Sequence, residues 1–211
     1  AVTVVSGGGL SLTSAGGIDV DTAVGTISAV TTGSGSVVIE ESDGVELKSV
    51  VASDGSISVS AGGSMVATKV ESTTNSAGND VTLATSAGGI QLVSVSVGEL
   101  GDVSVTSAGA ITGDGDAATV EITGGQLSLI AKDYIHSSND EYQYVPINID
   151  AKAVSADLKG NGIIYLYTSQ NIVFGLPIIE TNHHNYLLGI QLLSYQLVEL
   201  LICFSHYQIH V

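Results

Sequence analysis

The stretch DVTLATSAGGI at residues 80–90 decides the fold, because it returns at residues 102–111 as DVSVTSAGAI. Each copy begins with apolar residues that alternate with Ser, Thr or Ala, turns at a Ser-Ala-Gly corner, and resumes at an isoleucine. Alternation with a period of two is typical of a strand with one buried face. Glycine at the corner allows a sharp turn because it has no side chain to clash. The stretch therefore predicts two short strands joined by a tight corner.

The same spacing of apolar residues occurs six times before residue 136. In five pairs the second residue follows the first by eight positions, and in one pair by nine. The first members are Leu10, Val37, Ile57, Val81, Val103 and Leu127, and the second members are Ile18, Val45, Met65, Ile90, Ile111 and Ile135. A third apolar patch follows at a variable distance, and its members include Ile27, Val50, Val70, Val95, Ile122 and Val145. Each unit thus has two strands at a fixed spacing and a third after a connection of variable length.

A fixed internal spacing within a looser repeat is typical of a solenoid. We predict an all-β parallel β-helix with three short strands in each rung of about 23 residues, and about eight rungs in total. Each strand is expected to pair with its equivalent in the next rung, about 4.8 Å away. Residues 1–174 form this solenoid, with regular rungs to about residue 135 and aromatic-richer rungs over 136–174. Residues 175–211 are predicted to form an apolar C-terminal cap or docking segment.

The C-terminal segment contains a mostly apolar stretch at residues 187–204, close to the length of a membrane-spanning helix. Polar residues interrupt it at Gln191, Ser194, Gln196 and Glu199, and no Lys or Arg flanks it. We expect no membrane span, because a span needs an unbroken apolar stretch with anchoring residues at its ends. The segment is expected to cover the open end of the solenoid, as a helix or as further strands, or to dock another subunit.

The chain is strongly acidic, with 21 Asp and Glu residues against 5 basic residues and a formal net charge of −16. Such a surface repels nucleic acid and anionic lipid, so we expect neither as a partner. Acidic side chains also keep a β-surface rich in Ser and Thr from aggregating. Cys203 is the only cysteine, so no disulfide forms within the chain.

Two sets of residues carry atoms that bind metals. Asp114 and Asp116 are separated by one glycine and offer carboxylates to Ca²⁺, which prefers several hard oxygens; a plain acidic turn is the alternative. Cys203, His206 and His210 have the spacing of zinc ligands, but the chain holds no second cysteine, so we expect ordinary side chains there. The sequence indicates no cofactor other than this candidate Ca²⁺.

Every aromatic residue lies at or beyond Tyr134. Tyrosine rings on the outside of a solenoid offer a flat apolar surface with a polar tip, which suits a glycan or a cell-surface receptor. The candidate binding residues are Tyr134, Tyr142, Tyr144, Tyr165 and Tyr167.

The residues argue against an enzyme. A polysaccharide lyase needs a cation to stabilise its anionic intermediate, and the chain has no Arg and only five scattered Lys. A glycoside hydrolase needs two carboxylates that converge on one face, whereas the acids here stand mostly at predicted corners. We predict a protein without catalytic residues, and polysaccharide cleavage is the least favoured alternative.

The units at residues 9–18, 80–90 and 102–111 resemble filamentous-haemagglutinin-type repeats, which belong to large secreted bacterial adhesins and related surface proteins. The likeness covers residues 1–135 well and residues 136–174 loosely. It implies a right-handed parallel β-helix, export to the cell surface, and a role as stalk, adhesin or fibre. We therefore expect an extracellular structural or adhesive solenoid, either a segment of a larger adhesin or a subunit that stacks end to end with copies of itself. A carbohydrate- or receptor-binding module that uses the tyrosines is the alternative.

Overall fold

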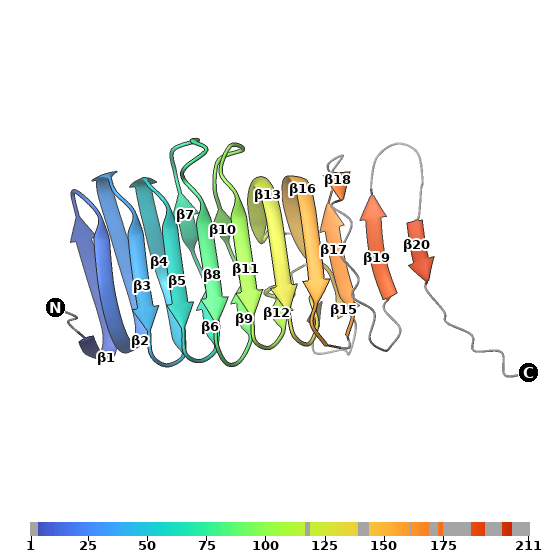
Figure 1. The fold of residues 1–211 in the computed structure, drawn as a ribbon, viewed down its shortest axis with the longest axis horizontal. Helices are drawn as coiled ribbons and strands as arrows, with labels where there is room; N and C mark the ends of the chain where they lie inside the picture. The colour runs from blue at the N-terminus through green and yellow to red at the C-terminus, as the bar shows by residue number, and fades with distance from the viewer. Residues whose placement is uncertain are drawn as a thin grey trace, which may run out of the picture.

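The computed structural model describes residues 4–116, 119–138, 144–160, 162–168, 173–174, 187–192 and 200–203. Within these residues the regular secondary structure is all β, and most of the strands belong to one 18-stranded sheet that winds into a coil. Figure 1 shows the strands side by side along the long axis of the molecule, from β1 at the N-terminal end to β20 at the other end. The predicted all-β parallel β-helix is confirmed.

Each long strand in this coil runs round one or more of its corners, whereas each short strand lies on a single face. In chain order the strands are β1 (Val4–Ser14), β2 (Ile18–Ser34), β3 (Val37–Glu41), β4 (Val45–Asp54), β5 (Ile57–Ala61), β6 (Met65–Ala67), β7 (Val70–Ser72), β8 (Val81–Thr85), β9 (Ile90–Leu92), β10 (Val95–Ser96), β11 (Val103–Ser107), β12 (Ile111–Thr112), β13 (Ile122–Ala131), β14 (Ser137–Ser138), β15 (Tyr144–Val145), β16 (Ile147–Leu158), β17 (Ile164–Thr168), β18 (Val173–Phe174), β19 (Leu187–Leu192) and β20 (Leu200–Cys203). Strands β14 and β15 form a separate antiparallel pair.

Three columns of parallel strands run along the coil, and each regular rung contributes one segment to every column. The first column stacks Ile18, Val37, Ile57, Val81, Val103, Leu127 and Val154. The second column stacks Val45, Met65, Ile90, Ile111, Ile135 and Ile164. The third column stacks Ala29, Val50, Val70, Val95, Ile122 and Ile149. The coil makes about 7 turns with a repeat of about 21 residues, close to the predicted rung.

The interior of the coil is filled by the residues that face inward from these columns. In β5, Ile57, Val59 and Ala61 are buried, whereas Ser58 and Ser60 between them are exposed. Equivalent residues stack on one another, so each buried side chain contacts similar side chains in the rungs on either side. Burying an Ile, Leu or Val side chain stabilises the folded chain by about 1.5–3 kcal/mol, and every rung repeats that contribution.

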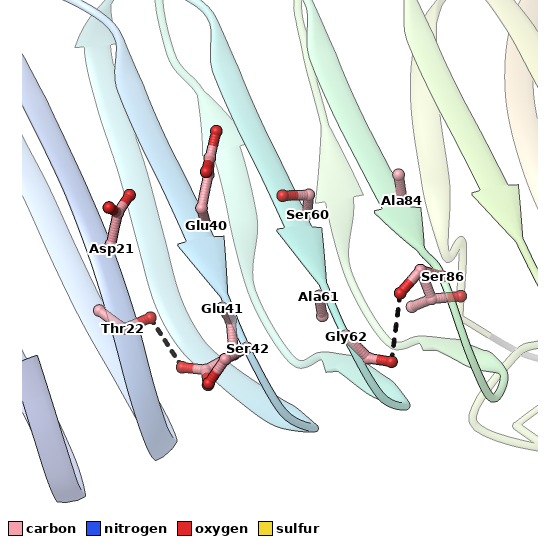
Figure 2. Close-up of a pocket in the computed structure, with 11 residues that line it drawn as sticks. Asp21, Thr22, Glu40, Glu41, Ser42, Ser60, Ala61, Gly62, Ala84 and Ser86 are labelled. Atoms are coloured by element: carbon pink, nitrogen blue, oxygen red, sulfur yellow. Dashed lines mark hydrogen bonds between the residues drawn. The ribbon is translucent and has the colours of Figure 1, made fainter. Parts of the chain in front are cut away.

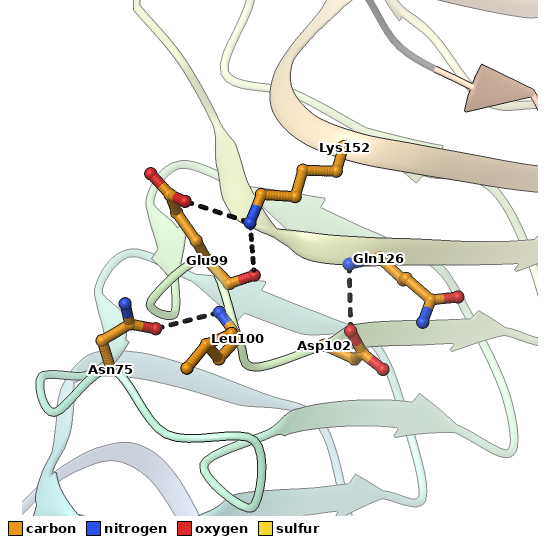
Figure 3. Close-up of polar contacts among 6 residues, drawn as sticks. All are labelled: Asn75, Glu99, Leu100, Asp102, Gln126 and Lys152. Atoms are coloured by element: carbon orange, nitrogen blue, oxygen red, sulfur yellow. Dashed lines mark hydrogen bonds and ion pairs between the residues drawn. The ribbon is translucent and has the colours of Figure 1, made fainter.

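Polar side chains tie the connections between the third and first columns to the neighbouring rungs (Figure 3). The side-chain carbonyl of Asn75 accepts a hydrogen bond from the backbone N–H of Leu100 at 2.9 Å. Asp102 Oδ1 accepts one from the backbone N–H of Gln126 at 3.0 Å. These connections differ in length, so their backbone groups do not all meet partners in the ladder, and side chains satisfy them instead.

The first predicted unit is wrong in its column assignment. Leu10 does not stack on Val37; it pairs with Ile27 and lies at the N-terminal end of the second column. Ile18, predicted to stand in the second column, pairs with Val37 in the first. Two inward-facing residues that are eight positions apart can lie in the first and second columns or in the second and first. The spacing alone therefore does not show which corners of the coil lie between them.

The third patch of the last regular unit also lies elsewhere than predicted. Val145 belongs to β15, which pairs with β14 outside the coil, and Ile149 takes the third-column position next to Ile122. The chain leaves the coil after Ile135 and rejoins it at Ile147. Spacing misses this excursion because it lengthens the unit without removing apolar residues from it.

Two strands lie in the C-terminal segment. Strand β19 pairs parallel with β17 and so extends the sheet beyond the regular rungs. Strand β20 pairs antiparallel with β19, so the parallel pairing of successive strands ends at β19. The other residues of 175–211, including His206 and His210, lie outside the described residues. The capping or docking role of the whole segment therefore stays a prediction.

Replacing Gly62 with alanine tests how closely the corners stack. A Cβ atom at this position would overlap the backbone oxygen of Ser42 in the neighbouring rung. We expect Gly62→Ala to lower the free energy of unfolding by about 1–3 kcal/mol, because one corner must move to make room. Urea unfolding followed by circular dichroism measures the change.

Gly78→Ala is the matched control, because no atom lies within 4 Å of a Cβ built at that exposed turn. We expect this variant to unfold at the same urea concentration as the wild type. Equal stability of the two variants would contradict the close stacking of corners.

Candidate functional site

The predicted tyrosine surface is partly assembled. Tyr134 is 39% exposed, and its ring stacks on that of His136 with centroids 4.4 Å apart. Tyr165 and Tyr167 lie on the outer face of β17, because Leu166 between them is buried in the coil. The three rings are therefore outside the core and available for contact.

The structure brings three of the five predicted tyrosines to one region. The residue after Tyr134 pairs with the residue before Tyr165, so these two tyrosines lie on neighbouring rungs. Tyr144 lies in β15, the backbone of which pairs with β14. Tyr142 lies outside the described residues. We define the aromatic surface as Tyr134, Tyr165 and Tyr167.

An open groove follows the outer face of the first column (Figure 2). Asp21, Glu40, Ser60 and Ala84 occupy equivalent outward positions on four successive rungs. Two carboxylates stand next to each other at one end, and small residues follow at the other. The groove therefore changes from acidic to neutral along its length.

Glu41 forms the inner wall of this corner and is buried. Its Oε2 atom accepts hydrogen bonds from Thr22 Oγ1 at 2.7 Å and from the backbone N–H of Val24 at 3.0 Å. Its Oε1 atom accepts one from the backbone N–H of Asp43 at 3.0 Å. Both carboxylate oxygens have donors, which compensates for the loss of water around the charge. Glu41 thus acts as a structural carboxylate that joins two rungs.

The predicted Ca²⁺ ligands Asp114 and Asp116 lie in an exposed turn. The backbone N–H of Asp116 donates to Asp114 Oδ1 at 2.8 Å, and Gly115 between them has a φ of 86°, which favours glycine. The local structure is therefore an acidic turn. The described residues hold no group of three or more His, Cys, Asp or Glu side chains placed to bind a metal ion. A Ca²⁺ site at this turn needs oxygens from other residue types.

A buried polar cluster lies behind this turn. It consists of Glu121, Ser137 and Asn148, which are 0%, 2% and 4% exposed. Glu121 and Asn148 occupy outward positions of the third column, because their neighbours Ile122 and Ile149 pair inside the coil. The turn covers them: the Asn148 side-chain amide donates to the backbone oxygen of Thr119 at 2.7 Å and to that of Asp116 at 3.4 Å.

The cluster contains three oxygens without a hydrogen-bond partner among the described residues: Glu121 Oε1, Ser137 Oγ and Asn148 Oδ1. The other carboxylate oxygen, Glu121 Oε2, accepts a hydrogen bond from the backbone N–H of Asn148 at 2.6 Å. Leaving a buried oxygen without a hydrogen-bond partner costs about 1–3 kcal/mol, so three such oxygens in one cluster require a physical explanation.

Burial raises the pKa of Glu121 from 4.5 to about 7. The negative charge of Asp114 raises this pKa further, while hydrogen bonds from the backbone of Asn148 and of Glu121 itself oppose the rise. The Glu121 carboxyl therefore changes its protonation near neutral pH. Perturbed groups of this kind gather at functional sites, although structural networks also produce them.

The sequence gives little sign of this cluster. Glu121 precedes an apolar strand, and Asn148 stands between two isoleucines, so the alternation predicts both on the exposed face. They are buried because the chain folds the turn after Gly113 over them. The only sequence signal nearby is the pair of aspartates in that turn.

Comparison of the chain with protein-family models, with curated proteins and with solved structures gave no match. The described residues include no helix of the length and apolarity that crossing a membrane requires.

The stability of the protein is expected to fall as the pH rises through about 7, because of Glu121. The pKa of this group is higher in the folded than in the unfolded chain, so the folded state holds its proton more tightly. The resulting stability is fully present below pH 4.5 and is lost as the pH rises through about 7. The shift corresponds to at most about 3 kcal/mol.

Glu121→Gln should remove this dependence. Urea unfolding of both proteins between pH 4 and 8 gives the difference in the free energy of unfolding at each pH. We expect the variant to gain stability over the wild type as the pH rises. Parallel curves for the two proteins would show that the Glu121 carboxyl does not titrate in this range.

Proposed function

We propose that this chain is a structural and adhesive solenoid that works outside the cell and stacks end to end with copies of itself. The observation that carries the proposal is the free edge of β1. This strand pairs with β2 along its length, and no strand of the described residues pairs with its other edge. An unpaired edge of this length presents backbone N–H and C=O groups to any strand that can continue the ladder.

The apolar core is open at the same edge. Leu10 and Leu12 are only half-buried, whereas their equivalents one rung further in, Ile27 and Ala29, are fully buried. One additional rung would satisfy the backbone of β1 and cover these two leucines. The edge therefore offers both hydrogen bonds and apolar contact to a partner.

A further rung of the same kind suits that edge best, supplied either by a second copy of this chain or by a neighbouring segment of a larger adhesin. The edge requires short strands that repeat with the same width and with apolar residues at the same inward positions, and the chain itself is built from such strands. A contact between unlike ends does not close on itself, so repeated stacking produces a fibre. The likeness of the repeats to those of secreted adhesins supports a fibre at the cell surface.

Charge at the open end of the core should block assembly. Leu12→Lys places an ammonium group where the next rung would pack, and its burial would be costly. We expect the wild type to form larger species with rising concentration in sedimentation velocity and fibres in negative-stain electron microscopy. The variant should stay small under the same conditions.

Ser11→Lys is the matched control, because Ser11 lies on the same strand but is exposed on the outer face. This variant should assemble like the wild type. Circular dichroism establishes that all three proteins are folded. Discrete wild-type monomers at high concentration would contradict the proposal.

The aromatic surface favours a second function, the binding of a glycan or a receptor. Tyr134 is exposed and its ring stacks on that of His136, and tyrosines give a large contact area at a low cost in conformational entropy. A glycan array tests this function directly. We expect Tyr134→Ala to lose any signal and Leu100→Ala, which alters an exposed apolar residue elsewhere, to keep it. An empty array for the wild type would count against glycan binding.

A further inference from the structure

Two of the three unpartnered oxygens lie beside the backbone of Gly113. A Cβ atom on Gly113 would overlap Glu121 Oε1 and lie 2.8 Å from Ser137 Oγ, so both oxygens approach the same point of the backbone, and only glycine can stand there. Asn148 is held against the same carboxylate by its backbone hydrogen bond to Glu121 Oε2. A carboxylate oxygen and a hydroxyl oxygen therefore come together beside Gly113, and the residue that carries the third unpartnered oxygen, Asn148, is bonded to the same carboxylate.

We propose that Glu121, Ser137 and Asn148 bind a hard divalent cation of the Ca²⁺ type beside Gly113, with Asp114 supplying a second negative charge. Ca²⁺ takes six to eight oxygen ligands from carboxylates, amide and backbone carbonyls and water. The unpartnered atoms of the cluster are all oxygens. The site does not depend on the proposed assembly.

Charge distinguishes a cation from a water molecule as the occupant. The carboxylate of Asp114 is close enough to Glu121 to repel its charge. The lysines that form ion pairs among the described residues do so with Glu71, Glu99 and Asp157, and not with either of these acids. A water molecule would satisfy hydrogen bonds but would not offset the repulsion between the two carboxylates once Glu121 is deprotonated. A divalent cation neutralises both, and so it should stabilise the fold.

The site explains the position of the acidic turn. Asp114 and Asp116 lie in a turn that is tied to Asn148 through the backbone oxygens of Asp116 and Thr119. Binding at the cluster would therefore hold the turn, the strand β16 and the strand β14 together. This is the region where the chain departs from the regular coil, so a cation there stabilises the least repetitive part of the fold.

The test is the binding of Ca²⁺ to protein treated with a chelator. Isothermal titration calorimetry gives the stoichiometry and affinity, and thermal unfolding with and without CaCl₂ gives the change in Tm. We expect one ion per chain and a clear rise in the Tm of the wild type. Glu121→Gln should weaken the affinity by about tenfold or more, because it removes the only carboxylate in the cradle.

Two further variants separate binding from folding. Ser137→Ala removes one ligand oxygen without breaking a side-chain hydrogen bond, so it should fold normally and bind Ca²⁺ more weakly. Glu41→Gln is the matched control, because it alters a buried glutamate whose oxygens already have three donors. This control should keep the wild-type affinity even if its Tm is lower.

Several results would overturn the proposal. One is a wild-type protein that shows neither a heat of binding in calorimetry nor a change in Tm when Ca²⁺ is added. Equal responses in the wild type, Glu121→Gln and Ser137→Ala would assign the effect to surface acids, and an equal Tm rise with MgCl₂ would assign it to screening of the net charge. If the Tm of the protein depends on pH but not on Ca²⁺, the protonated Glu121 side chain, and not a cation, stabilises this cluster.

Discussion

The parallel backbone ladder is the constraint on which the rest of this protein depends. Each strand pairs in register with its equivalent in the next rung, so every position along the chain stacks on the same position in its neighbours. Inward positions must therefore be apolar in rung after rung. Corners must be small for the same reason, as the contact between Gly62 and Ser42 illustrates. Composition and repeat length both follow from this stacking.

The ladder also determines the outer surface of the coil. Outward side chains form continuous rows, such as the one from Asp21 to Ala84, because equivalent residues of successive rungs stack. The ladder cannot end without leaving a strand unpaired on one side. The edge of β1 is such an end. Its backbone hydrogen-bonding groups lack partners on one side, and the leucines of the strand, which face the core, are only half-buried. The stability of the coil and the proposed assembly therefore depend on the same interaction.

Two buried glutamates show how regular and irregular parts of the coil differ. Glu41 faces inward at a regular corner, where donors from a neighbouring rung and from its own turn reach both of its oxygens. Glu121 sits at an outward position and is buried because the chain folds a turn over it. This turn shields the Glu121 carboxyl from water but does not provide a hydrogen-bond donor for its Oε1 atom. The buried oxygens without a hydrogen-bond partner therefore lie where the chain departs from the regular repeat.

The repeat predicted the inside of the regular rungs well. The spacing predicts the columns from Val37 to Leu127 and from Val45 to Ile135 correctly, because in-register stacking makes a residue's column depend on local spacing. It does not predict the units at the two ends. An eight-residue offset fits different corners, so it places Leu10 in the wrong column, and it places Val145 in the coil although the strand of Val145 pairs outside it.

The sequence by itself determined the all-β coil, the three strands in each rung, the small corners and the acidic surface, because each of these depends on residues close together in the chain. Only the tertiary structure decided which corner the first unit turns, which tyrosines meet, and which polar residues are buried. Glu121, Ser137 and Asn148 come together across 27 residues of sequence, and their burial depends on a turn and a strand pair that follow no repeat. Local spacing carries no information about such covering segments, so the cluster could be found only in the folded chain.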